Sequence, residues 1–181
     1  MYYSWEAVIS TEECESIIEQ YKDKANVNGA IKNTGASGNT DLSKRDVKIC
    51  WVKPEAMLNR VVASFMKEAN ERHFHYDMTG SEQMQFAKYE VDGKYCWHRD
   101  SISMGGNEVR KLTTVVQLSN PDNYEGGELQ FFNGDNDPEP SKIRKQGSVI
   151  VFDALDWHRA TAVTKGVRYT LAQWSQGANF I

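Results

Sequence analysis

Three residues in the second half of the chain, His98, Asp100 and His158, have the types and spacing of a metal site. The spacing of His98 and Asp100 allows both side chains to point the same way from the end of a strand. Two imidazoles and one carboxylate can hold a first-row metal on one face and leave three coordination positions open. The set therefore predicts a mononuclear centre that binds further ligands.

A fourth residue, Arg168, lies ten positions after His158 inside an apolar segment. A guanidinium group presents a planar fork that pairs with a carboxylate through two hydrogen bonds. An arginine on a strand next to the metal would thus be a clamp for an acidic ligand. Together the four residues suit an iron centre that binds a dicarboxylate cosubstrate and oxygen.

Strand-like segments fill the part of the chain that carries these residues. They are separated by turn pairs such as Asp92-Gly93 and Lys165-Gly166, a pattern typical of a sandwich or barrel. Alternation along 167–174 places Arg168, Thr170, Ala172 and Trp174 on one face, which suits the lining of a ligand cavity. The expected strands cover roughly residues 82–90, 95–99, 110–118, 127–132, 148–152, 157–162 and 167–174.

The first part of the chain is expected to supply helices that support the sheets. Ser10-Thr11-Glu12-Glu13 forms a capping box before a helical repeat, and Pro54 is suited to the first position of a helix that runs to about Arg72. A strand is expected at 47–52, and the polar segment 26–46 is interpreted as a long loop. Its part 30–45 is either a lid over the substrate, with Lys44 or Arg45 as the contact, or plain disorder.

Length and composition indicate one globular unit. The 181 residues, 25% charged and 40% hydrophobic, fit a single domain, with helical support over about 1–72 and a β core over about 82–174. The predicted fold is mainly β (α+β): a small jelly roll with N-terminal helices packed on one sheet.

Charge and cysteine content limit the partners and the compartment. A net charge of −4 and the lack of a basic aromatic stripe argue against nucleic acid, and no apolar run of membrane-spanning length occurs. The three cysteines are widely spaced without a CxxC pair, which excludes a zinc ribbon and favours a reduced, cytoplasmic protein.

Three motifs carry a resemblance to a known family. They are Tyr89-x-x-x-Gly93-x-Tyr95-x-x-His98-x-Asp100, EGGELQFF at 125–132 and GSVIVFDALDWHRATAVTKGVRYTLAQW at 147–174. This set resembles the iron(II)/2-oxoglutarate-dependent oxygenases, and within them the prolyl 4-hydroxylase-like group. The resemblance implies a double-stranded β-helix that uses Fe(II), 2-oxoglutarate and O2, with ascorbate as a candidate reductant. It also implies that the products are succinate, carbon dioxide and a hydroxylated substrate.

The resemblance assigns a role to each matching residue. His98, Asp100 and His158 match the metal ligands, and Arg168 matches the partner of the cosubstrate's 5-carboxylate. Tyr89 and Trp174 match pocket-lining positions, and Thr170 would add a hydrogen bond. Gln117 departs from the pattern, because some members have a tyrosine there, although an amide donor could serve. The carboxylate ligand Asp100 is retained, whereas a halide-binding halogenase variant would have a small residue there. The resemblance therefore implies hydroxylation and not halogenation.

Several functions remain open from the sequence alone. The leading hypothesis is hydroxylation of a prolyl residue in a peptide or protein, and the second is the same chemistry on a free amino acid or other small metabolite. A non-catalytic cupin-like binding module would not need Arg168. A zinc hydrolase would need a general-base carboxylate that no HExxH motif supplies. The acidic balance disfavours a nucleic-acid demethylase, and the oligomeric state is left open.

Overall fold

Strands dominate the protein in the computed structural model, which describes residues 2–31, 40–54, 56–101, 108–132 and 143–179. The largest sheet has the order β1-β11-β8-β14-β6-β4-β2, with β5 beside β14, and a second sheet has the order β10-β12-β7-β3. Strands β13 and β9 form a separate pair. The strands are β1 Tyr2–Trp5, β2 Val27–Asn28, β3 Arg45–Asp46, β4 Lys48–Trp51, β5 Gly80–Ser81, β6 Gln85–Tyr89, β7 Lys94–His98, β8 Glu108–Gln117, β9 Tyr124–Gly126, β10 Leu129–Phe131, β11 Val149–Asp153, β12 His158–Ala160, β13 Val163–Gly166 and β14 Arg168–Ala178.

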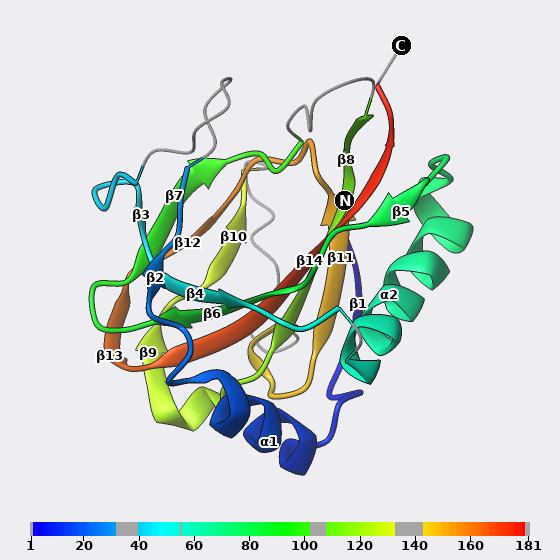
Figure 1. Cartoon of the computed structure of the whole chain (residues 1–181). Helices are drawn as coiled ribbons and strands as arrows, with labels where there is room; N and C mark the ends of the chain where they lie inside the picture. The colour runs from blue at the N-terminus through cyan, green and yellow to red at the C-terminus, as the bar shows by residue number, and fades with distance from the viewer. Residues whose placement is uncertain (1, 32–39, 55, 102–107, 133–142, 180–181) are drawn as a thin grey trace.

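The two main sheets face one another, and both helices lie on the far side of the larger sheet (Figure 1). A cavity between the sheets is lined from the large sheet by residues such as Thr113 and Thr170, and from the small sheet by His98 and His158. This arrangement confirms the predicted mainly-β jelly roll with supporting helices.

Helices α1 (Thr11–Tyr21) and α2 (Met57–Ala69) cover the large sheet because each buries an apolar stripe on it. Cys14 and Tyr21 of α1 join the core that contains Phe86 of β6, and Met66 of α2 packs with Leu112 of β8. The capping box of α1 is present: the Ser10 side chain accepts a hydrogen bond from the Glu13 backbone N–H, and the Glu13 side chain accepts one from Ser10. The α1 prediction is thus confirmed.

The strand alternation predicted from sequence is also confirmed. Phe86 and Leu171 face the helices, whereas their chain neighbours Gln85, Ala172 and Thr170 line the cavity between the sheets. Register explains this, because a one-residue slip would exchange the two faces of a strand. One face of the large sheet is therefore a dry core, and the other is available for ligands.

Some expected boundaries were wrong. Pro54 is not the first residue of α2, because the helix begins at Met57 with Ala56 as its N-cap and no side-chain capping bond. The chain after α2 continues as a π-helical turn, η1 (Asn70–Phe74), and a 3-10 turn, η2 (Pro121–Asn123), precedes β9. Strand β1 was not predicted, although it pairs with β11 over its whole length.

The segment expected to be one loop, 26–46, contains strands β2 and β3 at its two ends. Residues 32–39 of this segment lie outside the described residues, so the lid hypothesis is not tested for them. Neither α-helix of the described chain has the length and apolar character needed to cross a membrane.

Gly147 connects the chain before α1 to the large sheet, and its replacement is expected to destabilise the fold. Its φ is +78°, its carbonyl accepts hydrogen bonds from the N–H groups of Val8 and Ile9, and an added Cβ would lie 1.8 Å from the Ile9 carbonyl oxygen. We expect Gly147→Ala to lower the free energy of unfolding by about 2–4 kcal/mol, measured by denaturant titration. Gly80→Ala is the matched control, because nothing lies within 4 Å of its added Cβ. Equal stability of the two variants would contradict the expectation.

Candidate metal and cosubstrate site

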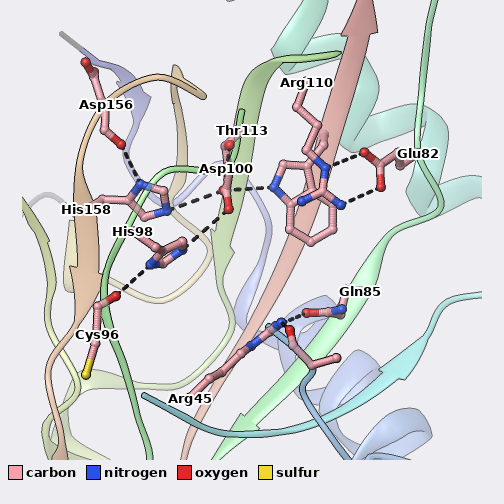
Figure 2. Close-up of polar contacts among 12 residues, drawn as sticks. Arg45, Glu82, Gln85, Cys96, His98, Asp100, Arg110, Thr113, Asp156 and His158 are labelled. Atoms are coloured by element: carbon pink, nitrogen blue, oxygen red, sulfur yellow. Dashed lines mark hydrogen bonds and ion pairs between the residues drawn. The ribbon is translucent and has the colours of Figure 1, made fainter. Parts of the chain in front are cut away.

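The three predicted metal ligands meet at one end of the two central strands of the small sheet (Figure 2). His98 is the last residue of β7, His158 is the first residue of β12, and the antiparallel pairing of these strands places the two histidines opposite one another. Asp100 follows β7 by two residues. Their candidate ligand atoms all lie within 4.8 Å of one another, so one ion could contact all three.

Backbone carbonyl groups orient both imidazoles. His98 Nδ1 lies 2.8 Å from the carbonyl oxygen of Cys96, and His158 Nδ1 lies 2.9 Å from that of Asp156. A carbonyl oxygen can only accept, so each Nδ1 carries a proton, and each ring in its neutral form presents the lone pair of Nε2. Both Nε2 atoms point at Asp100, at 3.5 Å from Oδ1 and 3.4 Å from Oδ2 (Figure 2). This is the tautomer that a metal ligand needs.

The carboxylate of Asp100 is fixed through one of its two oxygens. Oδ2 accepts hydrogen bonds from Thr113 Oγ1 at 2.8 Å and from Trp174 Nε1 at 2.9 Å. Oδ1 lies 3.5 Å from His98 Nε2. The donor set of two imidazole nitrogens and one oriented carboxylate oxygen therefore fits a divalent first-row ion such as Fe(II).

Electrostatics keep the carboxylate ionised. Burial alone would raise the pKa of Asp100, but the contacts with His158 and His98 outweigh it and hold the pKa well below its usual range. Burial lowers the pKa of His98, whereas at His158 the contact with Asp100 outweighs burial and raises the pKa. A buried anion between two imidazoles is an environment that favours a cation.

Arg168 lies in the same cavity as the triad, as the sequence predicted. It begins β14, is 5% exposed, and lines the cavity together with His98, Asp100 and His158. Tyr89 of β6 is its cross-strand partner, with the guanidinium carbon 5.6 Å from the centre of the tyrosine ring. Thr170 lies two residues further along the same face and is also buried. These residues form a positively charged end of the cavity suited to a carboxylate.

Trp174 and Gln117 are placed near the site but contact protein groups. Trp174 lines the cavity and donates its indole N–H to Asp100. The Gln117 amide oxygen accepts a hydrogen bond from Arg168 Nε at 3.1 Å, while its NH2 group donates to the carbonyl of Ser119 and the hydroxyl of Tyr124. The NH2 group of Gln117 therefore donates to other protein groups, and its amide oxygen holds the guanidinium of Arg168 in place.

Replacement of Gln117 is expected to weaken cosubstrate binding through Arg168. In Gln117→Leu the buried Nε of Arg168 loses its acceptor, and such a loss typically costs about 1–3 kcal/mol. We expect roughly tenfold weaker 2-oxoglutarate binding with unchanged Fe(II) affinity, measured by anaerobic titration. Gln117→Glu should weaken binding further, because its charge would compete for Arg168. Wild-type affinity in both variants would contradict a positioning role.

The structure also brings residues to the site that the sequence did not assign to it. Thr113 holds Asp100, and the ring of Tyr95 stacks on that of His98 with 3.5 Å between centroids. Arg45 of β3 lines the cavity beside Tyr95. The sequence held a signal for two of these residues. Tyr95 stands three residues before His98 within the quoted motif, and Thr113 alternates onto the same strand face as Gln117. For Arg45 the signal was its place, with Lys44, in the segment 30–45 that was interpreted either as a lid contacting the substrate or as disorder.

Comparison with known proteins agrees with the geometry. The profile of the 2OG-Fe(II) oxygenase superfamily matches residues 84–176. A PKHD-type hydroxylase of Gloeothece citriformis is 37% identical over 92 residues, which are 50% of this chain and 41% of that protein. A PKHD-type hydroxylase of Synechococcus sp. strain JA-2-3B'a(2-13) is 27% identical over 177 residues, 93% of this chain and 75% of its own length. The chain thus spans less than half of the first relative and three quarters of the second.

Solved structures show the same fold. The viral collagen prolyl hydroxylase of Paramecium Bursaria Chlorella virus-1, in complex with 2OG, superposes with a TM-score of 0.74 at 19% identity, covering 98% of this chain and 96% of that one. A prolyl hydroxylase of Trichoplax adhaerens, in complex with a hypoxia inducible factor peptide fragment, gives 0.72 at 20% identity, with 96% and 82% covered. The family match covers half of the chain and includes all four residues of the site. This protein belongs to the 2OG-Fe(II) oxygenase superfamily.

Proposed function

We propose that the protein couples oxidation of 2-oxoglutarate to hydroxylation of a prolyl residue in a peptide or protein. Dioxygen supplies one oxygen atom to the substrate and one to succinate, and carbon dioxide is released. The single observation that carries the proposal is the placement of the His98, Asp100 and His158 set and Arg168 around one cavity. A cupin-like binding module would have no use for a buried cation in the same cavity as a metal site.

Each group has a role in this proposal. His98, Asp100 and His158 would hold Fe(II), which supplies the oxidising chemistry when it is bound. Arg168, positioned by Gln117, would pair with the distal carboxylate of 2-oxoglutarate, and Tyr89, Thr170 and Trp174 would form the cavity wall around it. Apolar side chains in the cavity lining, such as Val115 and Leu129, lower the local dielectric constant and would strengthen these polar contacts.

The prolyl substrate is supported by the likeness to prolyl hydroxylases of known structure, one of them holding a peptide. Hydroxylation of a free amino acid or other small metabolite is the alternative. We further propose that residues 1–181 work as one domain, that ascorbate serves as reductant, and that the protein acts in the cytoplasm.

The test is anaerobic absorption spectroscopy of the purified protein with Fe(II), before and after 2-oxoglutarate is added. A keto acid that chelates the iron should give a weak visible charge-transfer band. Turnover should then be sought with proline-containing peptides, by following succinate release. Bound iron without a band would contradict the proposal and support a non-catalytic binding module.

A further inference from the structure

A second hollow of about 170 Å³ adjoins the metal cavity on its outer side. Six residues line both spaces and so form the boundary between them: Arg45, Gln85, Tyr95, His98, Asp100 and Trp174. A substrate that reaches the metal through the outer hollow would pass this boundary. Its side chains would then contact the substrate.

Arg45 is held firmly at this boundary. It is the cross-strand partner of Tyr95, and its guanidinium carbon lies 4.6 Å from the centre of that ring. Its Nη1 donates to the carbonyl of Ala30 at 2.6 Å, and its Nη2 donates to Gln85 Oε1 at 2.7 Å (Figure 2). A Cβ at Gly29 would lie 2.6 Å from Arg45 Nε, so a glycine there leaves room for the arginine. The guanidinium of Arg45 therefore lies on the ring of Tyr95, which in turn stacks on the metal-ligand candidate His98.

The charge of Arg45 has no acidic partner among the residues that the structure describes. Both of its hydrogen-bond acceptors are neutral, its Nε is buried without an acceptor, and no ion pair joins it to a carboxylate within the described part of the chain. Arg110, which lines the same outer hollow, differs because Glu82 binds it through both carboxylate oxygens. Asp100 also lines the hollow, but its charge faces the two imidazoles.

A half-buried cation against an aromatic ring loses part of its hydration, which costs free energy. An anion that enters the hollow and pairs with the cation would offset this cost. The guanidinium has further N–H groups beyond those used by Ala30 and Gln85. We infer that the substrate presents a carboxylate to Arg45 close to the carbon that is hydroxylated. The inference rests on the proposed function and narrows its substrate class. The carboxylate is either the α-carboxylate of a free or C-terminal residue, or an acidic side chain beside the target residue.

The experiment compares probes that differ only in a carboxylate. The pairs are N-acetyl-L-proline and its amide, a peptide ending in proline with a free or amidated terminus, and a peptide with glutamate or glutamine beside an internal proline. Each is titrated anaerobically into protein loaded with Fe(II) and 2-oxoglutarate, and the shift of the visible band gives Kd. At least one acid should bind about tenfold or more tightly than its amide, as for a hydrogen bond to a charged group. The pair that responds identifies the source of the carboxylate.

Variants separate recognition from structure. Arg45→Gln should bring the acid-to-amide ratio close to 1, and Arg45→Lys should retain part of it. Lys44→Met is the matched control and should keep the wild-type ratio, because this neighbouring cation is exposed and paired with Asp41. The band itself shows in every variant that the metal and the keto acid are in place.

Three results would overturn the inference: wild-type protein that does not distinguish any acid from its amide, failure of all acids to bind, or equal weakening of acid and amide by Arg45→Gln. The last would mean that Arg45 is only structural. Absence of the band in wild-type protein is a different result, which would refute the proposed function.

Discussion

His158→Ala is expected to abolish turnover and to weaken Fe(II) binding by more than about 100-fold, since loss of a residue that merely orients a ligand already costs 10–100-fold. His158 is 5% exposed and is paired with His98 across neighbouring strands. Its removal would leave the metal with one imidazole ligand in place of two. Removal also takes away a contact that keeps the pKa of Asp100 low. Fe(II) affinity and succinate formation are the two measurements.

His75→Asn is the control for His158→Ala. His75 is exposed, outside the cavity, and has a φ of +57° that asparagine tolerates. The control should keep wild-type iron binding and activity, and circular dichroism should show that both variants fold. An active His158→Ala protein would remove the triad assignment.

Arg168→Ala is expected to raise the 2-oxoglutarate concentration needed for half-saturation on the order of 100-fold or more, with Fe(II) binding preserved. A buried, charge-assisted pair is worth about 2–5 kcal/mol when one partner is truncated. The guanidinium is buried between Tyr89 and Gln117, so its removal leaves the carboxylate of the cosubstrate without a charged hydrogen-bond partner at this place. Isothermal titration with 2-oxoglutarate and the charge-transfer band would each report the change.

Arg168→Lys separates charge from geometry, because lysine keeps the positive charge but cannot form the two parallel hydrogen bonds. It should fall between wild type and Arg168→Ala. Unchanged affinity in Arg168→Ala would exclude the clamp. Loss of iron as well as 2-oxoglutarate would instead indicate damage to the whole cavity.

The sequence predicted the elements whose signals are local. The capping box at Ser10–Glu13 is such a signal, because the side chain and the backbone groups it binds are three residues apart. Alternation along β14 correctly placed Arg168, Thr170 and Trp174 on the cavity face, since side-chain direction in a strand repeats every two residues. The signal was weaker at β1, whose partner strand β11 is remote in the sequence. Pro54 suited a helix start, but the first turn formed three residues later.

For the site, the sequence by itself determined which groups are available: two histidines and an aspartate with the spacing of metal ligands, and an arginine in an apolar strand. Only the tertiary structure decided how they are used. The pairing of β7 with β12 brings His98 to His158, the pairing of β14 with β8 places Gln117 near Arg168, and the pairing of β3 with β7 places Arg45 beside Tyr95. The physical reason is that residue type and local spacing determine chemistry and side-chain direction, whereas the distance between remote residues depends on strand register, which the packing of the whole core sets.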